Sequence, residues 1–187
     1  MRIVAGTYSS RRIEAPKGNN TRPTLDKVRE AVFSSLGGFF AGGSFLDLYA
    51  GSGANGLEAL SRGMDEAVFV DSSRDAVQVI KKNIQSLGCK EQCRVLPMKD
   101  IKALLLLKEE GRQFDIVYLD PPYARETNDA VLAYLSEHHM VKKNGYVVIE
   151  SAKEDTFDAD HGYIKYVKDK VYGITRITYC RAEGDQQ

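Results

Sequence analysis

The sequence predicts an α/β protein with a doubly wound, mostly parallel seven-stranded sheet. Three observations predict this fold class. Short apolar runs alternate with segments of helical periodicity, and a glycine-rich turn follows the run at residues 44–48. Apolar and polar residues alternate within residues 163–171 and 175–181, which are joined through Tyr172-Gly173. Strands that alternate with helices form parallel sheets, whereas two alternating runs joined by a tight turn form an antiparallel pair. We therefore expect a small hairpin-helix extension over residues 1–40 and one larger domain over residues 41–187.

The N-terminal extension combines a predicted hairpin, a loop and a helix. Residues 2–5 and 11–15 are expected to pair, residues 16–23 are polar, and apolar side chains recur at helical spacing from Leu25 to Leu36. Thr24 is placed to cap this helix and Gly37-Gly38 to end it. The extension carries seven basic and three acidic residues, a net charge of +4, and the rest of the chain carries −4. Such an asymmetry indicates a polyanion partner, or a solvated arm without one.

The main domain continues with regular alternation. Residues 114–119 are nearly all apolar, as expected of a strand covered on both faces. Strands are expected over residues 44–48, 67–70, 94–98, 114–119, 145–150, 163–171 and 175–181, and helices over residues 54–62, 75–87, 101–108 and 126–139. Ligands of such folds bind at the carboxyl ends of the strands, so chemistry is expected there.

The turn after the first of these strands has the pattern G-x-G-x-x-G at Gly51, Gly53 and Gly56, and Asp71 closes the second strand. Glycine permits a tight turn and close approach of a ligand, and an acid at the second strand end can accept hydrogen bonds from ribose hydroxyls. A nicotinamide dinucleotide fits this pattern too, but Asp47 before the turn would repel its pyrophosphate. Asp47 suits the cationic methionine end of S-adenosylmethionine, or else it caps a backbone amide.

A second motif, Asp120-Pro121-Pro122-Tyr123, directly follows the apolar run at 114–119. The two prolines stiffen the turn and remove backbone donors. Asp120 and the carbonyl of Pro121 can accept both N–H bonds of an exocyclic amino group, and Tyr123 can stack on a base. Asp120 can also stabilise the charge that develops on the nitrogen, or take its proton. The motif indicates methylation of an amino group, although a plain turn before the next helix has the same composition.

Together these motifs resemble class I S-adenosylmethionine-dependent methyltransferases, and more closely the RsmD family. That resemblance rests on DLYAGSG at residues 47–53, DPPY at 120–123, RPTLDKVRE at 22–30 and GLEALSRG at 56–63, and it covers nearly the whole chain. The family implies a Rossmann-like fold and methyl transfer to the N2 amino group of a guanine in 16S ribosomal RNA. Two departures from the family pattern are the hairpin residues 5–12, which bear on RNA docking, and Asn55.

The resemblance assigns a role to each candidate residue. The expected catalytic set is Asp120, Pro121, Pro122 and Tyr123; the expected S-adenosylmethionine set is Asp47, Ala50, Gly51, Ser52, Gly53, Asp71, Ser72, Asp100 and Ile101; the expected RNA contacts are Arg11, Arg12, Arg22 and Arg29. Asp100 would contact the adenine amino group, although it is equally placed to cap the helix that follows. Extrusion of the guanine from its stack is expected, because its amino nitrogen must align with the methyl group and sulfur.

Composition excludes several other classes. No apolar run approaches the roughly 20 residues of a membrane helix, and the N-terminus does not resemble a signal peptide. Three cysteines, with Cys89 and Cys93 expected as buried filler, fit a reducing cytoplasm, and no His or Cys spacing indicates a metal. We expect a cytoplasmic monomer whose partner is ribosomal RNA or the small ribosomal subunit. The alternatives are an adenine-N6 DNA methyltransferase, a nicotinamide-dependent oxidoreductase, or a ligand-binding module without catalysis.

Overall fold

The computed structural model describes residues 1–18, 23–122 and 124–184. The chain divides into two compact units, Met1–Ala103 and Leu104–Gln187. Arg22 and Tyr123, both predicted site residues, lie outside the described residues.

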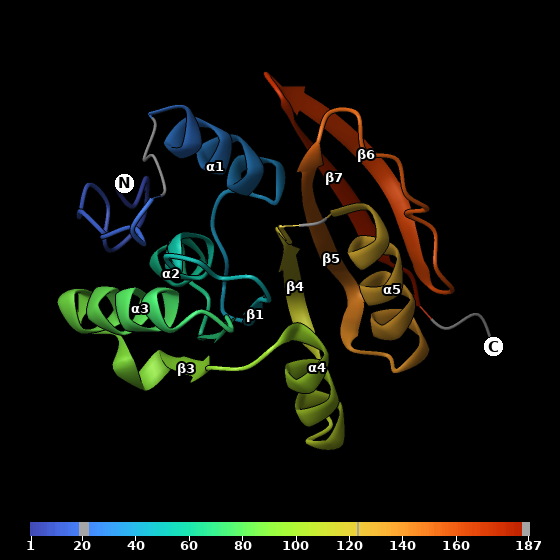
Figure 1. The fold of residues 1–187 in the computed structure, drawn as a ribbon, viewed down its shortest axis with the longest axis horizontal. Helices are drawn as coiled ribbons and strands as arrows, with labels where there is room; N and C mark the ends of the chain where they lie inside the picture. The colour runs from blue at the N-terminus through green and yellow to red at the C-terminus, as the bar shows by residue number, and fades with distance from the viewer. Residues whose placement is uncertain (19–22, 123, 185–187) are drawn as a thin grey trace. The chain divides into compact units, whose positions relative to one another are not determined.

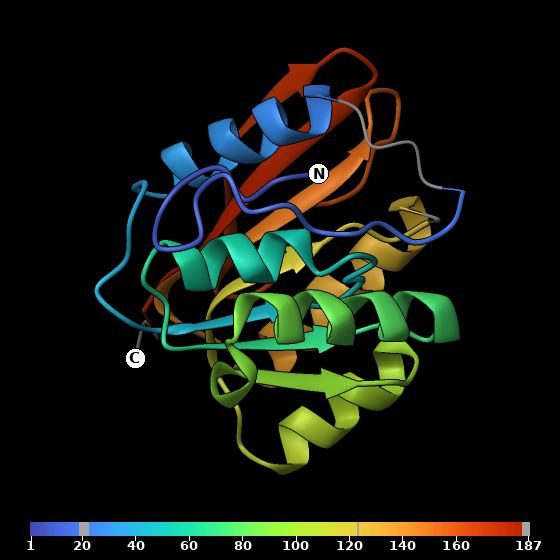
Figure 2. The same ribbon diagram turned by 90° about the vertical axis from the view of Figure 1, so that its left-hand side faces the viewer.

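The first unit is built on three parallel strands in the order β3-β2-β1, where β1 is Ser44–Asp47, β2 is Glu66–Val70 and β3 is Cys93–Leu96. Its helices are α1 (Pro23–Ser35), α2 (Ala54–Ser61) and α3 (Arg74–Leu87), with the short 3-10 helix η1 (Lys90–Gln92) before β3. The helix α2 packs on β1 and β2, and α3 packs on β3 (Figure 2). Because the strands are parallel, their carboxyl ends meet at one edge of this part of the sheet.

The N-terminal segment forms the predicted hairpin in a short form. Arg2 and Arg12 make a single antiparallel bridge, and the amide of Ile3 donates to the carbonyl of Arg11 at 3.0 Å. Ile3 and Ile13 are buried, so the hairpin contributes to the core of the first unit.

The second unit contains four strands in the order β4-β5-β7-β6 (Figure 1). They are β4 (Phe114–Leu119), β5 (Val141–Ala152), β6 (Ile164–Tyr172) and β7 (Thr175–Ala182), with α5 (Ala124–Glu137) between β4 and β5. The strands β4 and β5 are parallel, and β7 is antiparallel to both β5 and β6. Val147, Val148 and Ile149 are fully buried, which shows that β5 is covered on both faces.

The seven strands, mostly parallel and interleaved with helices, confirm the predicted fold class and its antiparallel C-terminal pair. The helix α4 (Asp100–Glu109) begins at Asp100, one residue earlier than predicted.

Some element boundaries were predicted wrongly. The helix α1 begins at Pro23, so Thr24 lies in its first turn and does not precede it as a cap. Proline suits this first position because the amide hydrogen that it lacks has no partner in a helix start. The helix α5 ends at Glu137 and not at His139, whose φ of 50° is left-handed and whose ring stacks on Tyr163.

The strand β5 was predicted to begin at Gly145, and it begins at Val141. Val141 pairs with Phe114, after which the register with β4 shifts before Ile116 pairs with Tyr146. The polar residues 142–144 lie within this irregular stretch, so their sequence concealed that the strand had already begun.

Candidate functional site

The glycine turn after β1 has an open side and a packed side. Gly51 and Gly53 adopt left-handed φ values of 57° and 81°. A Cβ added at Gly51 would meet no protein atom within 4 Å, whereas one at Gly56 would lie 2.4 Å from the Phe69 ring on β2. Gly56 therefore allows α2 to pack on β2, and Gly51 leaves room for a ligand to approach the backbone.

Asp47 ends β1 and is 1% exposed. Its Oδ2 accepts a hydrogen bond from the amide of Gly56 at 3.1 Å, so the carboxylate orients the start of α2. This is the amide-capping role that the sequence left open beside a role toward a cationic ligand. The second role stays a prediction.

Asp71, directly after β2, joins the two strand ends. Its Oδ2 accepts from the amide of Gly51 and its Oδ1 from the amide of Ser73, both at 2.9 Å. A carboxylate has about four lone-pair sites, so both oxygens retain capacity for ribose hydroxyls. Asp71 is half-buried and Ser72 beside it is exposed, which leaves this side of the turn accessible.

Asp100 lies at the start of α4, after β3, and is held by Tyr49. The Tyr49 hydroxyl donates to Asp100 Oδ2 at 2.7 Å, and the amide of Ile101 donates to Oδ1 at 2.7 Å. Burial, and secondly the bond to Asp100, raise the pKa of Tyr49, so its hydroxyl stays protonated and continues to donate. Ile101 is 59% exposed and offers an apolar surface beside this acceptor.

The first unit thus collects the predicted cofactor residues at the carboxyl ends of its three strands. Ala50 and Ser52 are buried within the turn, where Ser52 Oγ accepts from the amide of Ala54 at 3.2 Å, so both shape the loop. Tyr49 is the residue that sequence reasoning missed. An aromatic residue directly after the first strand was the available signal, but its partner is 51 residues away.

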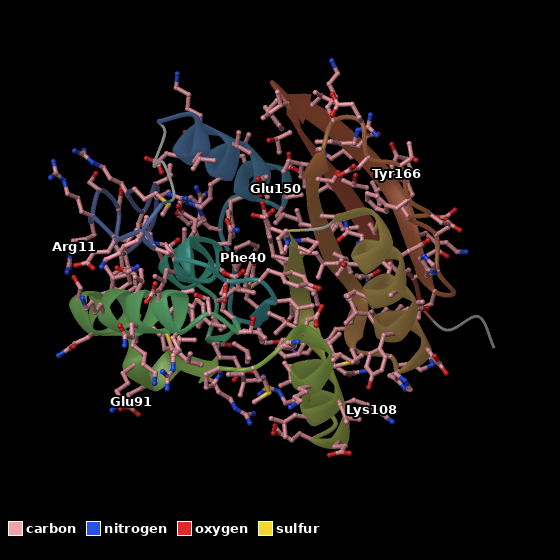
Figure 3. All side chains as sticks on the ribbon, in the orientation of Figure 1. Arg11, Phe40, Glu91, Lys108, Glu150 and Tyr166 are labelled. Carbon is pink, nitrogen blue, oxygen red and sulfur yellow. The ribbon has the colours of Figure 1, made fainter. Side chains whose placement is uncertain are left out.

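In the second unit, Asp120 is exposed directly after β4, Pro121 is buried and Pro122 is exposed. Leu119 and Ile149 pair in parallel register, so Asp120 and Glu150 are the next residues along neighbouring strands. Tyr118 donates to Glu150 Oε2 at 3.0 Å (Glu150 is labelled in Figure 3). Burial raises the pKa of Glu150, and the bond from Tyr118 lowers it in part. Sequence reasoning treated Glu150 only as the end of a strand.

The basic residues proposed for RNA differ in accessibility. Arg11 and Arg12 are exposed, and Arg11 donates to the carbonyl of Ser86 at 2.7 Å. Arg29 is 5% exposed, pairs with Glu58 and Asp26, and also donates to the carbonyl of Arg2. The guanidinium of Arg29 therefore makes its contacts within the protein, which contradicts its predicted role as an exposed RNA contact.

Among residues 1–18, 23–122 and 124–184, no group of three or more His, Cys, Asp or Glu side chains could hold a metal ion. Within the same ranges, no helix is long and apolar enough to cross a membrane.

Comparison with known proteins places this chain in a family. The family model described as conserved hypothetical protein 95 matches residues 1–181. YlbH of Bacillus subtilis is 34% identical over 98% of this chain and 100% of its own length. Ribosomal RNA small subunit methyltransferase D of Escherichia coli (strain K12) is 32% identical over 99% of this chain and 92% of its own. The structure of yhhF from Escherichia coli superposes with a TM-score of 0.84 at 29% identity and covers 99% of both chains.

Proposed function

The chain belongs to the conserved hypothetical protein 95 family, the RsmD family that its motifs resemble, and from that premise we propose its reaction. It transfers a methyl group from S-adenosylmethionine to 16S ribosomal RNA, at the exocyclic N2 amino group of a guanine. The proposed substrate is ribosomal RNA or the small ribosomal subunit, which implies a cytoplasmic protein. That the protein is a monomer stays a prediction.

The residues at the carboxyl ends of β1 to β3 fit S-adenosylmethionine, whose sulfonium makes the methyl group reactive without a metal. Asp71 retains acceptor capacity for both ribose hydroxyls beside the open face of Gly51. Asp100, held by Tyr49, offers an acceptor for the adenine amino group, and Ile101 offers an apolar surface for the ring. This Asp71–Gly51 arrangement is the observation that carries the cofactor assignment. A buried carboxylate at Asp47 also disfavours a pyrophosphate ligand.

Asp120 is the proposed acceptor for the guanine amino group. The lone pair of that nitrogen is delocalised into the ring, so an acceptor for its N–H bonds makes it a better nucleophile. The carbonyl of Pro121 and the ring of Tyr123 complete the proposed pocket, and Pro122 stiffens it. Asp120 stabilises the positive charge on the nitrogen as the methyl group arrives, and can take the released proton.

The test is single-turnover methyl transfer with labelled S-adenosylmethionine and small ribosomal particles from a strain that lacks the protein, followed by mapping of the methylated base. We expect Asp120→Ala to lower the rate about 10²-fold or more, while cofactor affinity stays unchanged. Asp120→Asn should lose less, because its amide oxygen still accepts a hydrogen bond.

The matched control is Asp115→Ala on the same strand, since Asp115 makes an exposed ion pair with Lys142. This control should transfer methyl groups at the normal rate. Near-normal transfer by Asp120→Ala would contradict the proposed role of Asp120. Methylation mapped to adenine, or no transfer by the wild type, would contradict the proposed reaction itself.

A further inference from the structure

The register of the last two strands gathers basic side chains on one face. Along β7, residues 175, 177, 179 and 181 alternate onto one face of the sheet. Their β6 partners are Tyr172, Lys170, Lys168 and Lys165, in that order. Lys165 and Lys168 are three residues apart, and in a regular strand they would point to opposite faces. The register shift between Tyr166 and Lys168 brings them to the same face.

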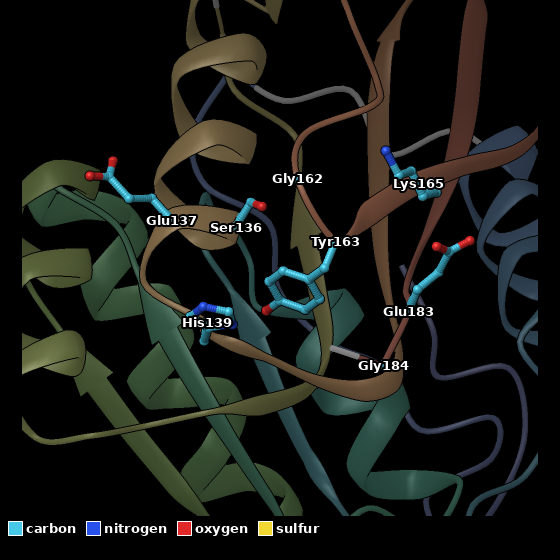
Figure 4. A pocket seen from close by; sticks show the side chains of 8 residues that line it. All are labelled: Ser136, Glu137, His139, Gly162, Tyr163, Lys165, Glu183 and Gly184. Carbon is cyan, nitrogen blue, oxygen red and sulfur yellow. The ribbon is translucent and has the colours of Figure 1, made fainter. Parts of the chain in front are cut away.

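This basic row consists of Lys165, Lys168, Lys170 and Arg181. Lys168, Lys170 and Arg181 are exposed, and Lys165 is half-buried beside Glu183 in the pocket that Figure 4 shows. Two aromatic rings support the row, because Lys168 Nζ lies 5.1 Å from the Tyr179 ring and Arg181 Cζ lies 5.6 Å from the Tyr146 ring. Such contacts hold a cation in place while it remains open to a ligand.

The nearest carboxylate of β6 does not neutralise this row. Asp169 pairs with Thr178, so it lies on the opposite face of the hairpin, where it makes an ion pair with Arg176 at 3.5 Å. Glu183 lies beside the row at one end. Asp160 lies at the edge of β6, where its Oδ1 accepts a hydrogen bond from the amide of Tyr166 at 2.7 Å. Four basic side chains exceed these two carboxylates, so the net charge along this edge is positive.

The row shares its face with the residues near the proposed catalytic motif. Ile177, opposite Lys170, pairs on its other side with Glu150 of β5, and Glu150 accepts the bond from Tyr118 of β4. Three strand spacings, about 14 Å, separate β4 from β6. A few nucleotides of a single strand can span that distance.

We propose that the basic row of Lys165, Lys168, Lys170 and Arg181 binds the phosphate backbone of the RNA whose guanine is methylated. This inference rests on the proposed function. Lys168 and Lys170 are two residues apart, about 6.8 Å along the strand, which resembles the separation of successive phosphates in an extended RNA strand. The basic row does not recognise the RNA sequence, because phosphate contacts fix only the position and register of the RNA.

Lysines on an edge strand have another recognised use, since their charge prevents pairing of the edge with a second chain. The strand β6 is an edge strand of the sheet. It also carries Tyr166 and Val167, each of which is 47% exposed. The test must therefore separate RNA binding from protection of the edge.

The experiment compares the wild type with a variant carrying Lys168→Gln, Lys170→Gln and Arg181→Gln. Binding of 16S ribosomal RNA transcribed in vitro is measured from 0.05 to 0.5 M salt. Each lost phosphate contact should reduce the slope of log K against log salt by about 0.7, so three contacts reduce it by about 2. If the wild type and the variant bind equally at 1 M salt, this change of slope makes the variant bind about 50-fold more weakly at 0.15 M salt. KM for RNA should rise while kcat at saturating RNA is unchanged.

A variant with Lys81→Gln, Lys90→Gln and Lys108→Gln is the charge-matched control, because these lysines are exposed on other elements. Equal loss of affinity in both variants would overturn the proposal, since a general charge effect would explain it. Unchanged RNA binding would overturn it too, and dimers of the first variant in sedimentation would then assign the lysines to edge protection. Cofactor binding and methyl transfer by the wild type are measured separately, so failure of the proposed reaction is distinguished from failure of the row.

Discussion

The buried carboxylate of Glu150 accepts a hydrogen bond from the Tyr118 hydroxyl of the neighbouring strand at 3.0 Å. Glu150 follows three buried apolar residues of β5, so its position indicated only the end of a strand. Its partner Tyr118 lies 32 residues away, and that contact depends on the parallel register of β4 and β5. The position of Asp71 and Asp100 at strand ends was predictable, and their role toward a ligand stays a prediction. The contact of Tyr49 was not predictable, because it is a long-range bond to Asp100.

Relative to the wild type, the Glu150→Gln variant should gain stability as pH rises. Burial raises the folded-state pKa of Glu150 above its value in the unfolded chain. The fold therefore favours the protonated form, and this contribution is fully present below the unfolded pKa of about 4.3 and is lost as pH rises through the folded pKa. Glutamine imitates the protonated form at every pH.

Calorimetry between pH 4 and pH 9 measures this effect as the difference in Tm between Glu150→Gln and the wild type. That difference should become more positive with rising pH, whereas the exposed Glu154→Gln should show no such trend. A difference that is constant across the range would contradict the account of Glu150.

At the scale of elements, Glu58 fastens the N-terminal segment to α2. It is fully buried and accepts hydrogen bonds from the amides of Val4 and Ala5 at 2.8 and 3.1 Å, and from Arg29 and Arg62 at 3.1 Å each. The sequence placed Glu58 on a helix and Arg29 in a basic extension, and the contact between them could not be read from local spacing. The domain boundary at residue 40 stays a prediction, while these bonds tie the extension to the first unit.

Glu58→Gln should destabilise the protein by about 3–5 kcal/mol, because the buried guanidinium of Arg62 loses its ion pair and that of Arg29 keeps only its ion pair with Asp26. Urea unfolding, followed by circular dichroism, measures the loss. Glu91→Gln is the control, since Glu91 is exposed, and it should change the free energy of unfolding by less than about 0.5 kcal/mol. A loss below about 1 kcal/mol in Glu58→Gln would show that water or rearrangement replaces the ion pairs.

At the scale of the whole molecule, the alternation of apolar runs and helical segments was sufficient to predict the fold class. The register shift between Tyr166 and Lys168 was not predictable, because the alternation of residues 163–171 does not reveal where one extra residue is accommodated. That shift decides which lysines share a face. The predicted cofactor residues all lie in the first unit, and the predicted catalytic motif lies in the second. We therefore expect mutations in the predicted catalytic motif to lower methyl transfer without changing cofactor affinity.

S-adenosylhomocysteine, the product of the proposed reaction, should stabilise the full chain and protect the ends of β1, β2 and β3 from amide hydrogen exchange. At a ligand concentration of 100 Kd the stabilisation is about 2.7 kcal/mol. Protection should be largest at residues 49–53 and at Ser73, because the amides of Gly51 and Ser73 donate to the Asp71 carboxylate. Asp71→Ala should weaken binding by about 1.5–3 kcal/mol for each ribose hydrogen bond lost, and it should abolish the protection at residues 49–53.

Asp75→Ala, an exposed change in the first turn of α3, is the control and should bind as the wild type does. Because Asp71 also orients the amide of Gly51, exchange in the ligand-free variant must be measured first. Protection that persists in Asp71→Ala at equal occupancy would place the ribose elsewhere on the first unit.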